Sequence, residues 1–157
     1  MLVDFLLALG LNLCISSLLL MGLVQQIQGW QRLTTRLELT RSSRYIVGQL
    51  KHDLGVIGKD ISIRRSESST IIVCNSFFGQ YQITYELNRQ GLYKRTTTRK
   101  GIGTNPVFIP NVLIYDWQPQ KLSSNQMRIS FILKRGQQSL PITALIHCPN
   151  GQIVEEL

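Results

Sequence analysis

The chain has few cysteines, few acidic residues and no familiar catalytic motif. Its 157 residues include three cysteines, and no pair of them has the C-x-x-C spacing of a zinc ribbon or a thioredoxin-like site. G-x-S-x-G, H-E-x-x-H and P-loop motifs are also missing, so we expect no metal, no cofactor and no catalysis. Acidic residues number nine against seventeen basic ones. The resulting formal charge of +8 favours anionic partners such as lipid headgroups, nucleic acid or acidic protein surfaces.

Two histidine pairs are candidate catalytic dyads. His52 precedes Asp53 in a helical segment, and His147 precedes Cys148 at the end of a strand-like segment. Adjacent residues of a helix point in different directions, and neighbours on a strand face opposite sides of the sheet. We therefore expect neither pair to meet, and enzyme activity is not predicted.

Charge and proline are both missing from Phe5 to Val24, a leucine-rich run. At a rise of about 1.5 Å per residue this run spans roughly 30 Å, the thickness of a bilayer core. A cleavable signal would need basic residues before the run and a small-residue cleavage site after it, where the sequence has MGLVQQ. Residues 1–24 are therefore predicted to form a retained transmembrane helix, in which Cys14 packs as a small hydrophobic residue.

The basic residues follow this run instead of preceding it: Arg32, Arg36, Arg41, Arg44 and Lys51. Under the positive-inside rule they would keep the rest of the chain in the cytoplasm. The alternative is that a basic segment lies upstream of Met1 in the full gene product, which would place the rest of the chain outside.

Residues 25–58 are predicted to continue the same helix, since no proline interrupts them. Their apolar side chains recur at helical spacing and form one stripe, which needs a packing partner. The stripe consists of Leu39, Ile46, Leu50, Leu54 and Ile57, with Val47 close by.

Residues 59–157 carry the alternation typical of strands with one buried face. Strands are expected at TIIVCN (70–75), QYQITYEL (80–87), LYKRTT (92–97), VFIPNVLIYDW (107–117), NQMRISFILKR (125–135) and QQSLPITALIHC (137–148). NRQG (88–91) and Arg135-Gly136 are expected turns, and RSESS (65–69) and TRKGIGTNP (98–106) exposed loops. Pro110 and Pro141 indicate edges or bulges. The predicted fold is α+β, with one long N-terminal helix packed on an antiparallel sheet of four to six strands.

Cys74 and Cys148 both lie in or beside predicted strands. They would pair as a disulfide in an oxidising compartment, or remain two separately buried thiols.

The start of the chain, MLVDFLLAL, resembles the N-terminus of type IV pilin-like proteins. Leu2, Val3, Asp4, Leu6, Ala8 and Leu9 occupy the places of the family signature. Asp4 stands where the family has glutamate, and Phe5 replaces a leucine. RSSRYIVGQLKHDL is similar to the amphipathic helix of minor pilins, and ITYELNRQGLYKR to their recurrent hairpin. Within this family, the chain resembles the branch of minor pilins and pseudopilins that includes J-type secretion pseudopilins, W-type minor pilins and ComGF-like competence pseudopilins.

This resemblance implies a non-catalytic subunit that acts in filament initiation or assembly of a type IV pilus, a competence pseudopilus for DNA uptake or a type II secretion pseudopilus. Its partners would be other pilins or pseudopilins, membrane lipid and an inner-membrane assembly platform. The head would lie outside the cytoplasm, and the assembled subunit would lie in a filament or at the cell surface. Asp4 would neutralise the N-terminal amine of a neighbouring subunit, unless it only lies solvated at the headgroups. Small residues would permit close helix approach: Gly10, Ser16, Ser17 and Gly22.

A second hypothesis is a stand-alone, single-pass membrane receptor for an anionic ligand such as DNA. Four cations and an aromatic residue lie on the predicted hairpin and its following loop, where they could grip a phosphate backbone and stack a base: Tyr93, Lys94, Arg95, Arg99 and Lys100. The two hypotheses differ in one respect. A pilin must leave the bilayer, whereas a receptor stays in it.

Overall fold

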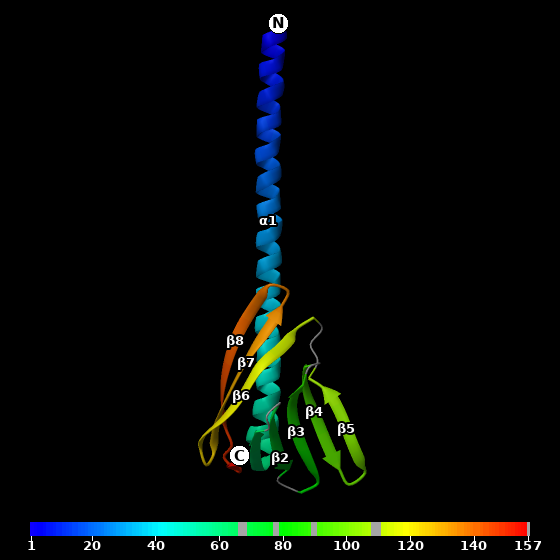
Figure 1. The fold of residues 1–157 in the computed structure, drawn as a ribbon, viewed down its shortest axis with the longest axis vertical. Coiled ribbons are helices and arrows are strands. Elements are labelled where there is room, and N and C mark those ends of the chain that lie inside the picture. The colour runs from blue at the N-terminus through cyan, green and yellow to red at the C-terminus, as the bar shows by residue number, and fades with distance from the viewer. Residues whose placement is uncertain (66–68, 77–78, 89–90, 108–110, 157) are drawn as a thin grey trace. The chain divides into compact units, whose positions relative to one another are not determined.

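The computed structural model describes residues 1–65, 69–76, 79–88, 91–107 and 111–156, which form one long helix and nine strands (Figure 1). Helix α1 runs from Leu2 to Leu50, and a π-helical segment, η1 (Lys51–Ile57), follows it directly. The predicted helix of about fifty residues is thus confirmed. Contacts within the chain divide it into two compact units, Met1–Leu37 and Glu38–Leu157.

Unit Met1–Leu37 is helical from Leu2 onward, as its uninterrupted run of good helix-forming residues predicts. Its side chains are exposed, apart from Thr35, which is half-buried. From Phe5 to Val24 the helix is apolar on nearly every side, and such a helix suits a hydrocarbon environment better than water. This stretch of the unit therefore favours apolar surroundings.

Unit Glu38–Leu157 contains two sheets (Figure 1). The six-stranded sheet has the order β5-β4-β3-β2-β1-β9, and the three-stranded sheet the order β6-β7-β8. The strands are β1 (Gly58–Arg65), β2 (Thr70–Ser76), β3 (Tyr81–Asn88), β4 (Gly91–Thr98), β5 (Gly101–Pro106), β6 (Leu113–Ser123), β7 (Gln126–Arg135), β8 (Gln138–His147) and β9 (Gln152–Glu156).

The core of this unit lies where the end of α1 and η1 meet the two sheets. Along the helix, Leu39, Ile46, Leu50 and Leu54 are at most 1% exposed, which confirms these four positions of the predicted stripe. Val47 is half-buried against the same core, and the side chain of Ile57 lies outside the described part of the chain. From the sheets, alternate residues of β3 and β7 join the same cluster, as the period-two pattern predicts. The chief contributors are Ile83, Tyr85, Met127, Ile129, Phe131 and Leu133. η1 itself contacts β1, β2 and β8.

Several sequence-based boundaries were wrong. Residues 101–106, expected in a loop, form strand β5, because their backbone pairs along the length of β4; only Arg99 and Lys100 form a turn. The strand expected at 107–117 begins at Leu113 and continues to Ser123. Strands β1 and β9 were not predicted, and their mutual pairing is parallel, so the sheet is mixed.

Other expectations agree with the structure. The hairpin of β3 and β4 forms in antiparallel register, with Asn88 opposite Gly91. Pro141 lies in β8, which is an edge strand of its sheet, as proline's missing N–H predicts. Pro110 and most of the 65–69 loop fall outside the described residues.

Candidate functional site

The apolar unit is one candidate functional surface. By length and composition, the helix is able to cross a membrane, and none of its most apolar stretch is buried within the chain. Two of the four small residues predicted to face neighbouring helices are glycines with open surroundings, because a Cβ at Gly10 or Gly22 would meet no atom within 4 Å. Ser17 donates its hydroxyl to the carbonyl of Cys14 at 2.8 Å, so its polarity is satisfied inside the helix. Ser16 and Cys14 are exposed.

Asp4 lies in the first turn of α1, and its carboxylate has a partner in the same chain. Asp4 Oδ2 lies 2.9 Å from the amino nitrogen of Met1, and both groups are exposed. The contact joins two groups three residues apart at the start of the helix.

A buried charge cluster joins η1 to the hairpin of β3 and β4. The Asp53 side chain is only 4% exposed. Its Oδ2 accepts a hydrogen bond from the Tyr85 hydroxyl at 2.5 Å and forms an ion pair with Lys94 Nζ, also at 2.5 Å. Tyr85 and Lys94 are direct cross-strand partners, so they present both donors to one point. Burial, and then the hydrogen bond to Asp53, raises the pKa of Tyr85 above its ordinary value. A buried carboxylate held by a cation and a hydroxyl is adequately satisfied.

His52 completes this cluster. Its Nδ1 lies 3.3 Å from Asp53 Oδ1, so the two adjacent side chains touch although they were expected to point in different directions. The His52 side chain is mostly exposed, whereas Asp53 points into the core. His147 and Cys148 behave as expected, since His147 is exposed and Cys148 is buried.

The structure separates the five residues predicted to contact an anion or DNA. The Lys94 side chain is 19% exposed and pairs with Asp53, so this ion pair competes with any contact between Lys94 and a ligand. Arg95 is exposed and, as the next residue along β4, lies on the opposite face of the sheet. Arg99 and Lys100 form the exposed β4–β5 turn, while Tyr93 is half-buried in β4. Lys94 and Arg95 therefore lie on opposite faces of the sheet, and Arg99 and Lys100 lie in a turn at the end of β4.

Cys74 and Cys148 are both buried free thiols in the structure. Burial raises the pKa of Cys74 to about 12, and electrostatic repulsion of its thiolate by Cys148, Asp53 and Asp60 contributes further to the increase. Burial raises the pKa of Cys148 to about 11. Both groups are accordingly protonated and unreactive at neutral pH.

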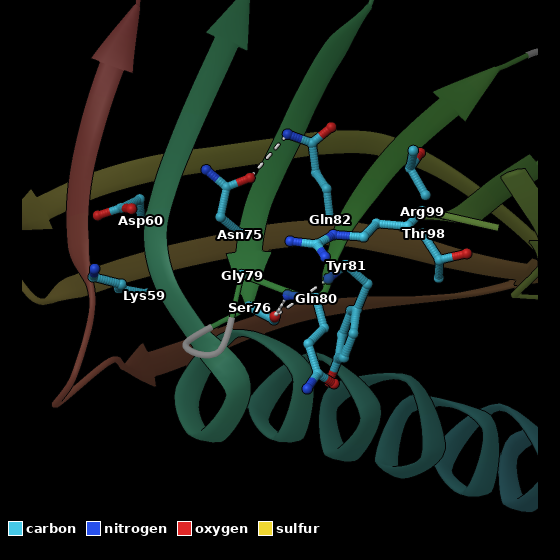
Figure 2. A pocket seen from close by; sticks show the side chains of 11 residues that line it. Lys59, Asp60, Asn75, Ser76, Gly79, Gln80, Tyr81, Gln82, Thr98 and Arg99 are labelled. Carbon is cyan, nitrogen blue, oxygen red and sulfur yellow. Dashed lines mark hydrogen bonds between the residues drawn. The ribbon is translucent and has the colours of Figure 1, made fainter. Parts of the chain in front are cut away.

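An open groove of about 710 Å³ lies at one end of the six-stranded sheet (Figure 2). Its walls come from the start of β1, the end of β2, residues 79–80, the start of β3, the end of β4 and the β4–β5 turn. The Arg99 side chain extends toward the middle of the groove, and Lys59 and Asp60 lie at the opposite side. The lining residues are Lys59, Asp60, Asn75, Ser76, Gly79, Gln80, Tyr81, Gln82, Thr97, Thr98 and Arg99. Sequence patterns missed this groove because its residues come from separate parts of the chain, at 59–60, 75–76, 79–82 and 97–99.

Among the described residues, no group of three or more metal-ligating side chains is able to hold an ion. A scan against protein-family models finds no matching family, and searches of curated proteins and of solved structures find no match.

Proposed function

We propose that this chain is a minor pilin or pseudopilin, a structural subunit that acts in the initiation or assembly of a type IV pilus, a competence pseudopilus or a type II secretion pseudopilus. In this role the apolar helix holds the subunit in the inner membrane and later packs against like helices. The head of residues 38–157, outside the cytoplasm, contacts neighbouring pilins.

The observation that supports this function best is the composition of α1. Its first part is exposed and apolar on every side, whereas its last part buries a narrow stripe against a sheet. A helix of this kind serves both as a membrane segment and as the spine of a head domain. The open positions at Gly10 and Gly22 permit close approach of a second helix. The resemblance of MLVDFLLAL to pilin N-termini agrees with this arrangement.

The carboxylate of Asp4 provides the sharpest test. In a filament core of low dielectric, this charge would pair with the N-terminal amine of a neighbouring subunit. We expect Asp4→Asn to reduce the amount of the chain in sheared extracellular filaments by about tenfold or more, since a charge-assisted hydrogen bond is lost. Asp4→Glu is the matched control, because it retains the charge, and it should assemble normally.

The chain should be expressed from its native locus with the upstream DNA intact, and immunoblots should compare the filament and membrane fractions. Mass spectrometry of the N-terminal peptide in the same samples would show whether a leader is removed. Retention of all wild-type protein in the membrane, with none in filaments or in complexes with other pilins, would refute the proposal.

The second candidate is a stand-alone membrane-anchored receptor for an anionic ligand. The observation that favours it is the open groove into which Arg99 extends (Figure 2). Fractionation distinguishes the two candidates, because a receptor never leaves the bilayer.

A further inference from the structure

The groove beside Arg99 has a well-defined frame. The Ser76 hydroxyl, which is almost completely buried, accepts hydrogen bonds from the backbone N–H groups of Gln80 and Tyr81 at 3.2 and 3.4 Å. Gly79 supplies the left-handed conformation that this turn requires, with φ of 63°. At the second turn, the Thr98 hydroxyl donates to the Gly101 carbonyl and accepts from the N–H of Lys100. Both walls are thus held by side-chain to backbone hydrogen bonds.

Two cations face this groove without partners in the described part of the chain. Arg99 projects into it from the β4–β5 turn, and Lys59 lies across from it on β1 (Figure 2). By contrast, Lys94, Arg64 and Arg65 all pair with carboxylates elsewhere in the described residues. Asp60 is the single carboxylate among the described lining residues. The groove therefore carries net positive charge that the fold leaves unused.

The rest of the lining is neutral and hydrogen-bonding. Gln82 Nε2 donates to Asn75 Oδ1 at 2.9 Å, which leaves the Asn75 amide hydrogens and the Gln82 carbonyl oxygen for a ligand. Gln80, Thr97 and Thr98 line the same space. Most pockets for apolar small molecules are lined by hydrophobic side chains, and this one is not. Its chemistry matches a ligand rich in hydroxyl groups.

Aromatic stacking, the usual support for single-stranded nucleic acid, is weak in this groove. Tyr81 is the one aromatic residue among the described lining residues, and it is half-buried and packs against the hydrophobic core. A single aromatic ring supports at most one stacked base, whereas proteins that bind single-stranded nucleic acid stack successive bases on several rings. Positive charge combined with amides and hydroxyls favours a different kind of polyanion.

We propose that this groove binds an anionic polysaccharide, a chain whose sugar units carry both hydroxyl and carboxylate groups. Arg99 and Lys59 would hold the carboxylates, because guanidinium and ammonium groups form charge-assisted hydrogen bonds with them. Asn75, Gln80 and Gln82 would bind the sugar hydroxyls, since an amide both donates and accepts. This binding does not depend on entry of the chain into a filament.

The test uses the full chain in neutral detergent micelles, with binding followed by isothermal titration calorimetry. The probes are polygalacturonate, uncharged dextran and a single-stranded thymidine oligonucleotide. The variants are Arg99→Ala and Gln80→Ala. Lys121→Ala is the matched control, because it also removes an exposed cation but lies on β6, outside the groove. Thermal melts would establish that every variant is folded.

Binding of polygalacturonate by the wild type is expected, with a loss of about tenfold or more in Arg99→Ala and a smaller loss in Gln80→Ala. Lys121→Ala should bind within about twofold of the wild type, and dextran should not bind measurably. Three results would overturn the assignment: no binding of polygalacturonate by the wild type, equal losses in Arg99→Ala and Lys121→Ala, or tighter Arg99-dependent binding of the oligonucleotide. The last result would make the groove a nucleic-acid site.

Discussion

The ion pair between Asp53 and Lys94 should behave as one unit, and a double-mutant cycle measures this directly. Lys94→Met would leave the Asp53 carboxylate buried with only the Tyr85 hydroxyl at Oδ2, and removal of one partner from a buried pair costs about 3–5 kcal/mol. Asp53→Asn should cost less, roughly 2 kcal/mol, because Lys94 is 19% exposed and its ammonium group is able to turn toward water.

The variant that carries both substitutions has no buried charge, and the amide oxygen introduced by Asp53→Asn still accepts from the Tyr85 hydroxyl. Its cost should therefore be about 1–2 kcal/mol, well below the sum of the two single costs. We expect a coupling energy of at least about 2 kcal/mol between the two positions.

The assay is urea denaturation of the full chain in micelles, followed by the fluorescence of Trp117. This residue is 6% exposed, and its ring centroid lies 6.0 Å from that of Phe131 in the core. A Trp30→Phe background removes the other tryptophan, which is exposed on α1. The matched control is Arg64→Met, because Arg64 pairs with Glu156 at the surface and should contribute less than about 1 kcal/mol. Additive costs for Asp53→Asn and Lys94→Met, within about 0.5 kcal/mol, would refute the view that this pair connects η1 to the hairpin.

Three further predictions concern packing and titration. Gly58→Ala should destabilise the head by about 1–3 kcal/mol, because the new Cβ would lie 2.6 Å from the Leu54 carbonyl oxygen and 2.8 Å from Cys74 Sγ. Gly48→Ala should instead stabilise the head by about 0.5–1 kcal/mol, because Gly48 lies on an exposed helix face and its new Cβ would meet no atom within 4 Å. Equal stabilities of the two variants in urea denaturation would contradict this prediction. The pKa of the Cys74 thiol is raised from 9.0 to about 12 in the folded chain. Its contribution to the free energy of unfolding is therefore complete below pH 9 and is lost as the pH rises toward 12, with about 1.4 kcal/mol lost near pH 10. Cys74→Ala should flatten this part of a curve of stability against pH. Ile46→Ala should cost about 2–5 kcal/mol and lower Tm, since Ile46 is fully buried; an unchanged Tm would argue against the packed stripe.

The elements predicted correctly from sequence are those with a strong apolar period. Met127, Ile129, Phe131 and Leu133 alternate over a long segment, so the amino-acid pattern by itself identifies β7. The stripe from Leu39 to Leu54 is equally clear. In both cases the pattern is local, and the buried face alone decides the conformation.

The missed strands depend on distant partners. β5 has the sequence GIGTNP, whose glycines and proline have low strand propensity, and its conformation follows from pairing with β4. β1 has only Ile61 and Ile63 as buried apolar residues within it, and β9 only Ile153. So few buried apolar residues do not identify a strand from the sequence, because β1 and β9 are stabilised by hydrogen bonds to neighbouring strands.

The charge cluster could have been anticipated in part. Asp53 follows Leu50 by three positions and Ile46 by seven, so it falls on the buried stripe of the helix, where a carboxylate needs a partner. The antiparallel register of β3 and β4 places Tyr85 opposite Lys94. Together these positions identify Lys94 as the partner of Asp53. The groove, by contrast, forms only when residues 59–60, 75–76, 79–82 and 97–99 come together, and it has no sequence signal of its own.

The parallel pairing of β1 and β9 has a consequence for biogenesis. Arg64 in β1 bonds to Glu156 in β9, 92 positions later in the chain. During synthesis the apolar segment and β1 leave the ribosome long before β9, so β1 has one exposed edge until the rest of the head has been made. Contacts this distant in sequence also form slowly. The apolar segment is therefore complete while the head is still open, and a chaperone that covers the free edge of β1 would protect the head until β9 arrives.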